Sequence, residues 1–355
     1  MKHRGVVYDV GLNFNGDKFS VEPFNLALVE YDMRAIANDL HANAVRIEGE
    51  EIHRLEIATR SAHSTGLKVF FNPWKMNADI AETRTYYEDA AKAAERLRNE
   101  GIDLVFVAGC EYTIFGKGVF PGDTFNERVM FMASQFVGGH LSDDLSDALR
   151  EKSVELNQVL RSFVEVIRAH FEGPVTYSAG SWELVDWDMF DIVGLDYYRR
   201  GETAEKYVSG LDRYRLGKPL AVLEVGCCAY EGAAARGDGG FVLLQGTNPD
   251  GTGIFEGGIV PTRSEEEQAD YVGTQLELLD NAGVDAVFIY VFSFPCLPTG
   301  EGARDLDMMC FSLVKHFAED DPRSKAMPPW ESKASFHRLA GLFRSMAVQD
   351  VGDID

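Results

Sequence analysis

Short apolar segments alternate with longer amphipathic ones along almost the whole of this 355-residue sequence. The apolar segments lack the polar–apolar alternation of a strand with one face in water, so we expect strands that are buried on both faces. A parallel sheet covered by helices requires such strands. The expected strands are residues 5–14, 43–49, 67–74, 102–109, 173–182, 192–198, 220–226 and 284–294.

Eight strand–helix units without an internal domain break favour an α/β fold of the (β/α)8 TIM-barrel type. A doubly wound sheet alternates in the same way, but no Gly-rich phosphate-binding motif follows the first expected strand. Long connections follow strands four, seven and eight, and in a barrel these loops would surround the mouth where active sites lie. We therefore expect one catalytic barrel over residues 1–346 and an acidic C-terminal tail over 347–355.

The charge balance narrows the range of partners. Acidic residues outnumber basic ones by 57 to 34, which gives a net charge of −23. A field of that sign repels phosphate backbones and anionic lipids, so we expect neither nucleic acid nor a membrane surface as a partner. The N-terminal residues lack the apolar core of a secretion signal. The five cysteines are scattered and odd in number, which favours a reduced, cytoplasmic protein.

Two glutamates stand just past expected strands four and seven. Glu111 lies in VFVAGCEYTIF (105–115) and Glu224 lies in LAVLEVGCC (220–228). In a barrel these strands end on opposite sides of one mouth, so the two side chains can meet across it. Paired carboxylates in such a place are the apparatus of glycoside hydrolysis, one as acid and one as nucleophile. A lone strand-end glutamate more often caps a helix or pairs with a lysine, but this pair favours catalysis.

Three motifs are similar to those of retaining β-glycosidases that carry glutamates at strands four and seven. The nearest match is the β-mannanase-type branch, glycoside hydrolase family 113. The resemblance implies that Glu111 is the acid/base and Glu224 the nucleophile. It also implies that Arg46 and Tyr198 contact the Glu224 carboxylate. The motifs are NAVRIEG (43–49), FDIVGLDYY (190–198) and GKPLAVLEVG (217–226).

The charge of Arg46 supports this interpretation on physical grounds. An arginine within an apolar strand is costly unless it is paired, and Glu48 or Glu50 could pair with it as well as Glu224. An arginine beside Glu224 would keep that carboxylate ionised, whereas Glu111 needs a raised pKa to act as an acid.

Two positions depart from the pattern of this clan. Cys110 precedes Glu111 where most members have an asparagine that binds the sugar 2-hydroxyl, and a thiol is a weak hydrogen-bond partner. Tyr290 stands at the end of strand eight, where a tryptophan platform is usual. Trp74 and Trp182 follow strands three and five, and we expect them to line sugar subsites or else to pack a loop onto the barrel.

The sequence therefore predicts a retaining glycoside hydrolase that acts on a β-linked oligosaccharide or a small β-glycoside. We expect no cofactor and no catalytic metal, because the histidines form no HxH or HExxH arrangement. The alternative is a barrel that binds carbohydrate without cleaving it, in a regulatory or defence role. Cys110 favours this alternative, whereas the retained pair of glutamates argues against it. The sugar, the linkage and the oligomeric state stay open.

Overall fold

The centre of the molecule is a closed barrel of parallel strands. The computed structural model describes residues 1–14, 18–136 and 146–352. Within these residues, eight strands form one sheet in the order β5-β4-β3-β2-β1-β10-β7-β6. Ala179 closes the sheet between β5 and β6, because its N–H donates to the Gly194 carbonyl (3.1 Å) and its carbonyl accepts from the Asp196 N–H (2.9 Å). The TIM barrel predicted from the sequence is confirmed. The strands are β1 (His3–Asp9), β2 (Ala44–Gly49), β3 (Lys68–Pro73), β4 (Leu104–Cys110), β5 (Val175–Ser178), β6 (Val193–Asp196), β7 (Leu220–Val225) and β10 (Ala286–Ile289).

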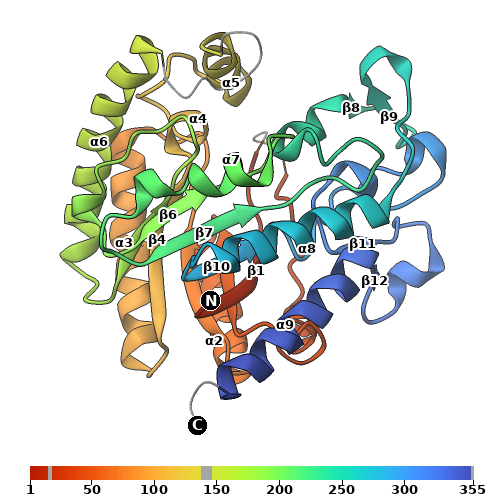
Figure 1. Cartoon of the computed structure of the whole chain (residues 1–355), viewed down its shortest axis with the longest axis horizontal. Helices are drawn as coiled ribbons and strands as arrows, with labels where there is room; N and C mark the ends of the chain where they lie inside the picture. Colours follow the sequence, from red (N-terminus) through yellow and green to blue (C-terminus); the bar gives the residue numbers. More distant parts are fainter. Residues whose placement is uncertain (15–17, 137–145, 353–355) are drawn as a thin grey trace.

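Helices cover the outside of the barrel (Figure 1). Their apolar residues recur at helical spacing, as in α6, where Leu149, Leu156, Leu160 and Phe163 are buried. No helix within the described residues has the length and apolar composition that a membrane crossing needs. The helices of this layer are α1 (Leu26–Arg34) with a π-helical extension η1 (Ala35–Asp39), α2 (Ile52–Ser64), α3 (Ile80–Asn99), α6 (Asp147–Arg168), α7 (Ala204–Ser209), α8 (Glu265–Asn281) and α9 (Ala334–Gly352).

The long connections contain structure of their own. Each of the three follows the carboxyl end of a strand, namely β4, β7 or β10. Figure 1 shows α5 and the β8–β9 hairpin at the upper edge of the molecule, whereas the C-terminus lies at the lower edge. These connections hold α4 (Tyr112–Phe115), α5 (Phe125–Ser134), β8 (Leu244–Thr247), β9 (Gly253–Phe255), β11 (Val314–His316) and β12 (Trp330–Ser332). Short 3-10 turns are η3 (Trp187–Met189), η4 (Asp212–Tyr214), η5 (Gly237–Leu243), η6 (Glu256–Gly258), η7 (Gly302–Arg304), η8 (Asp307–Met309) and η9 (Pro322–Lys325).

The last helix extends further than the sequence suggests. We expected it to end near Met346, but α9 continues to Gly352 and includes most of the predicted acidic tail. Helix α5 matches the short helix expected near 125–136, whereas the end of that connection, 137–145, lies outside the described residues.

The side chains of β2 face alternately out of and into the barrel, and this places charged residues in its interior. Val45 and Ile47 pack in the apolar layer between strands and helices. Because successive strand residues face opposite sides, Arg46 and Glu48 point into the barrel interior. Both are fully buried there. The interior is therefore partly ionic, although most of the other inward side chains are apolar.

A buried carboxylate joins the first and last parts of the chain. Asp32 of α1 accepts hydrogen bonds from the Tyr8 hydroxyl (2.9 Å) and from Nε1 of Trp330 (2.9 Å). These partners come from β1 and β12, so one side chain links the N-terminal strand, the first helix and the last connection. Loss of this carboxylate would leave two buried donors without partners, which is costly.

Asp32→Asn should remove a pH-dependent part of the stability. Burial raises the pKa of the Asp32 carboxyl from 3.8 to about 7, so the native state keeps a proton that the unfolded chain releases at lower pH. This contribution to the free energy of unfolding is complete below the unfolded pKa and is lost as the pH rises through the folded one. Urea denaturation measures the free energy of unfolding of both proteins. The value for the wild type minus that for the variant should fall by a few kcal/mol from about pH 4 to about pH 8. A difference that does not change with pH would contradict this account.

Candidate active site

Glu111 stands at a backbone irregularity at the end of β4. The register between β4 and β5 shifts between Val107 and Cys110, and such bulges re-aim side chains near active sites. Gly109 has φ +89°, and a Cβ there would lie 2.4 Å from the Tyr87 hydroxyl. Glu111 itself adopts φ 42° and ψ 49°, a left-handed conformation that is unusual for a residue with a side chain. Such strained residues cluster at functional sites, which supports a functional role for this glutamate.

Glu224, near the end of β7, is held on both carboxylate oxygens. Oε1 accepts from Nη1 of Arg46 (2.9 Å), and Oε2 accepts from the Tyr198 hydroxyl (3.0 Å). The Cys110 thiol lies 3.4 Å from Oε1. Arg46 and Tyr198 thus make the contacts with Glu224 that the resemblance implies.

Arg46 reaches several groups from its buried position on β2. Its Nε donates to Oδ1 of Asn72 (2.9 Å), and its Nη1 donates to the Leu223 carbonyl (3.0 Å). Two more carboxylates lie near the guanidinium, at 3.3 Å from Oε2 of Glu48 and 4.0 Å from Oδ1 of Asp196. The Glu48 contact is an ion pair without hydrogen-bond geometry, since neither Glu48 oxygen has a hydrogen-bond partner among the described residues. One cation therefore faces three carboxylates.

Asp196 is the member of this group that the sequence interpretation missed. Its Oδ1 accepts from the Ser178 hydroxyl (2.5 Å), and its Oδ2 lies 3.4 Å from the Cys110 thiol. Burial and then the charge of Glu224 raise the pKa of Asp196 well above its ordinary value. The available signal was its place at the end of β6, within the same motif that contains Tyr198.

Glu111 lies in an environment that favours the neutral acid. Burial raises the pKa of Glu111 well above its usual range, and the charges of Asp196 and Glu224 raise it further. No hydrogen bond to its carboxyl group joins it to the rest of the described residues. Glu224, in contrast, has two hydrogen-bond donors on its carboxylate oxygens.

A second buried glutamate anchors the segment after Glu111. Glu183 accepts from the N–H and the hydroxyl of Thr113 (3.1 and 2.7 Å), and from the Tyr177 hydroxyl (2.9 Å). The Tyr177 hydroxyl in turn accepts from the Tyr112 N–H (2.6 Å). Burial raises the pKa of Glu183 to about 7. This network fixes α4, and thereby the backbone that follows Glu111.

The aromatic residues expected to bind sugar are packed to different degrees. Trp74 is 5% exposed, and its ring lies edge-on to that of Phe115, with ring centres 4.7 Å apart. Trp182 is 4% exposed and donates from Nε1 to the Thr113 hydroxyl (2.9 Å). Tyr290 is partly exposed, with its ring centre 6.0 Å from that of Phe311. The two tryptophans thus pack loops onto the barrel, and sugar contacts by these residues stay predictions.

An ion pair joins the loops after β6 and β7. Arg200 donates from Nε and Nη2 to the two carboxylate oxygens of Asp238, at 2.6 Å each. A Cβ on Gly237 would lie 2.6 Å from the Arg199 carbonyl, so the two loops approach closely. The charge of Asp238 also contributes to the raised pKa of Glu111, which places this pair beside the site.

The donor set at the site suits a guanidinium better than a metal ion. One sulfur and two carboxylate oxygens, from Cys110, Asp196 and Glu224, lie within 4.8 Å of one another. The positive charge of Arg46 is already 2.9 Å from Glu224 and would repel a cation bound there. These residues give no reason to add a metal to the chemistry.

Several solved structures resemble the chain along nearly its whole length. A GH113 β-1,4-mannanase is 14% identical with a TM-score of 0.57, over 97% of this chain and 100% of that one. A GH113 β-mannanase from Alicyclobacillus acidocaldarius is 15% identical with a TM-score of 0.54, over 97% of each chain. A β-glucosidase from Pyrococcus furiosus is 12% identical with a TM-score of 0.55, over 97% of this chain and 95% of that one. This chain shares their barrel fold.

These barrels include the β-mannanase branch whose motifs the sequence resembles. At such low identity the likeness establishes the fold alone. No family model and no curated protein matches the sequence. Any conclusion about activity must therefore rest on the residues of the candidate site.

Arg46→Ala should destabilise the protein far more than removal of an exposed arginine. The variant leaves Glu224, Glu48 and Asp196 without their shared buried cation, and breaking a buried pair costs about 3–5 kcal/mol. Arg60→Ala is the matched control, because it removes an exposed pair with Glu100 (2.7 Å) that is worth about 1 kcal/mol or less. Chemical denaturation of both variants measures the difference. Equal losses would show that Arg46 does not balance these carboxylates.

Proposed function

We propose that this protein is a retaining hydrolase of β-linked glycosides. The proposal rests on the different surroundings of the carboxyl groups of two glutamates, at the ends of β4 and β7. Glu224 has a guanidinium and a hydroxyl on its oxygens, whereas Glu111 is partly exposed, lies among negative charges and has no hydrogen-bond partner for its carboxyl group among the described residues. Retaining hydrolysis needs this division, one carboxylate to attack and one carboxylic acid to donate a proton.

In the first step, an oxygen of Glu224 attacks the anomeric carbon while the bond to the leaving oxygen breaks. Glu111 gives its proton to that leaving oxygen, so a neutral alcohol departs and Glu224 becomes a glycosyl ester. Arg46 and Tyr198 hold the Glu224 carboxylate in position for this attack. Tyr198 can remain hydrogen-bonded to the ester oxygen that does not carry the sugar.

In the second step, water attacks the same anomeric carbon. Glu111, now a carboxylate, takes a proton from this water, and the ester bond to Glu224 breaks. Conversion of Glu224 to an ester removes its negative charge, which had helped to raise the pKa of Glu111. The pKa of Glu111 is therefore lower in the glycosyl-enzyme, so the group that is protonated before the first step is ionised and can act as the base in the second.

The substrate class follows from the site and from the resemblance. We infer a neutral β-linked oligosaccharide or small β-glycoside, because anionic sugars would enter a site that already holds several carboxylates. The structural relatives include β-mannanases and a β-glucosidase, so β-mannosides and β-glucosides are the first compounds to test. Cys110 lies at the position of the sugar-binding asparagine and contacts Glu224 instead (3.4 Å).

A mechanism-based inactivator should label Glu224. Incubation with 2-deoxy-2-fluoro-β-mannosyl and β-glucosyl fluorides should trap the ester, and peptide mass spectrometry should locate it. Glu111→Gln should lower kcat on substrates with poor leaving groups by about a hundredfold or more, and azide should restore turnover of activated aryl glycosides. Binding of these compounds without a covalent adduct or turnover would instead support the non-catalytic carbohydrate-binding barrel.

The pH dependence of kcat/KM should show an alkaline limb that belongs to Glu111. Its raised pKa keeps the carboxyl protonated where an ordinary glutamate is ionised, and activity is lost as the pH rises through that value. Glu111→Gln should remove this limb for a 2,4-dinitrophenyl glycoside, whose leaving group needs no proton. A variant that retains the wild-type alkaline limb would assign the acid to another residue.

A further inference from the structure

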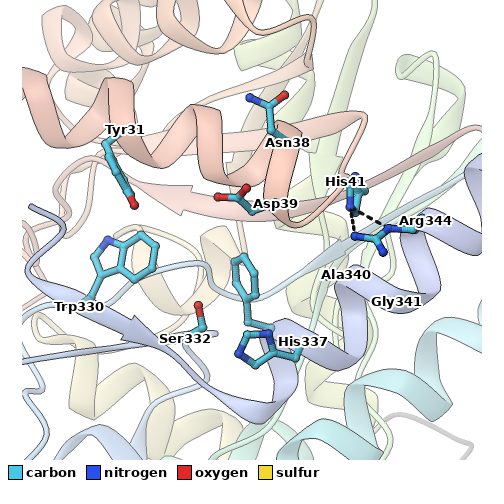
Figure 2. Close-up of a pocket in the computed structure, with 11 residues that line it drawn as sticks. Tyr31, Asn38, Asp39, His41, Trp330, Ser332, His337, Ala340, Gly341 and Arg344 are labelled. Carbon is cyan, nitrogen blue, oxygen red and sulfur yellow. Dashed lines mark hydrogen bonds between the residues drawn. The ribbon is translucent and has the colours of Figure 1, made fainter.

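An open cavity of about 580 Å³ lies outside the barrel, between the first and last helical segments (Figure 2). Its walls come from α1 and η1 on one side and from β12 and α9 on the other. Asp39 and His41 precede β2, so they lie at the amino ends of the strands. Glu111 and Glu224 lie at the carboxyl ends. The cavity lies on the outer side of the barrel and contains neither of these glutamates.

Several polar side chains line this cavity without using their hydrogen-bonding groups inside the protein. Asn38, Asp39 and His337 are exposed, and Ser332 is partly exposed. Among the described residues, none of these four side chains has a hydrogen bond to another protein group. Together they offer both donors and acceptors along the lining of the cavity.

One negative and one positive side chain, Asp39 and Arg344, line the cavity and do not form an ion pair with each other. Arg344 donates from Nε and Nη2 to Nε2 of His41 (3.1 and 2.8 Å), so this imidazole nitrogen carries no proton. Arg344 has no carboxylate within 4.0 Å in the described part of the chain, and Asp39 has no cationic partner there. An anionic ligand would meet Asp39 and a cationic ligand would meet Arg344. A neutral ligand with many hydroxyl groups can satisfy both side chains.

Aromatic side chains form the apolar part of the wall. Tyr31 is partly exposed, and its ring lies edge-on to that of Trp330 with centres 5.8 Å apart. Phe336 and Trp330 are 5% and 8% exposed, so they back the cavity. Gly341 leaves space, because a Cβ at this position would meet no atom within 4 Å. Aromatic surface beside unpaired polar groups suits the mixed apolar and hydroxylated faces of a sugar.

We propose that this cavity is a second carbohydrate-binding site, which takes a short neutral oligosaccharide. The inference goes beyond the proposed hydrolysis, because it needs neither Glu111 nor Glu224. Binding here would hold an oligosaccharide on the outer wall of the barrel through Asn38, Asp39 and the cavity floor at Gly341.

The test uses fluorine NMR of the full chain labelled with 5-fluorotryptophan. The labelled protein carries the Glu224→Gln substitution, so that the oligosaccharides added as ligands are not hydrolysed. The four tryptophans give four resonances, and Trp330→Phe assigns the one at the cavity. Titration with β-1,4-linked mannotetraose and cellotetraose should shift the Trp330 signal. Trp74, near the barrel mouth, reports binding at the proposed active site independently.

Gly341→Leu should fill the cavity and weaken the Trp330 response at least tenfold. Ser345→Leu is the control, because it adds a leucine to an exposed position of the same helix outside the cavity. Asn38→Ala should weaken the response about threefold to tenfold without loss of stability, since its side chain has no hydrogen-bond partner in the described part of the chain. In the active background, Gly341→Leu should leave aryl glycoside turnover unchanged.

Three results would overturn the proposal. These are an unchanged Trp330 signal with both tetrasaccharides, a response that survives Gly341→Leu, or a response to inorganic phosphate in place of sugar. Absence of turnover or of labelling at Glu224 would overturn the proposed hydrolysis alone. A saturable Trp330 shift would still support the second site in that case.

Discussion

The buried guanidinium of Arg46 is the interaction on which the rest of the site depends. It lies inside the barrel because β2 alternates, with Val45 and Ile47 facing the helices and Arg46 facing inward. A charge in such a place is stable only with opposite charges around it, and β7 supplies one at 2.9 Å. The remaining carboxylates exceed what one cation can balance, so burial raises the pKa of Glu48 and Asp196. The interior is thus a proton-holding network around a single fixed charge.

The two candidate catalytic groups differ because their strands end differently. The pairing of β7 with both neighbouring strands also shifts register beside Glu224, but the strand continues to Val225, and the Glu224 oxygens reach Arg46 and Tyr198. β4 is interrupted by a register shift, and Glu111 leaves it in a left-handed conformation that the Glu183 network supports from behind. Two identical residues thus have different backbone conformations and different surroundings, and the proposed division into acid and nucleophile rests on this difference.

The outer layer joins chain ends that are far apart in sequence. Asp32 connects β1, α1 and β12, and the cavity proposed to bind carbohydrate lies along the same junction of α1 with α9. This cavity lies on the outside of the barrel, where α1 and η1 face β12 and α9, and several of its polar side chains have no hydrogen-bond partner among the described residues.

The sequence by itself determined the strand–helix alternation, the barrel and the two strand-end glutamates, because apolar periodicity and position in the chain are local properties. Its motifs also brought Arg46 and Tyr198 to Glu224. Only the tertiary structure decided that Asp196 joins the group around Arg46, that Glu183 anchors the segment after Glu111, that Trp74 and Trp182 are packed, and that α9 runs to Gly352. Those outcomes depend on contacts between residues far apart in sequence. Burial and charge at such contacts sum over many neighbours that no short stretch of sequence contains.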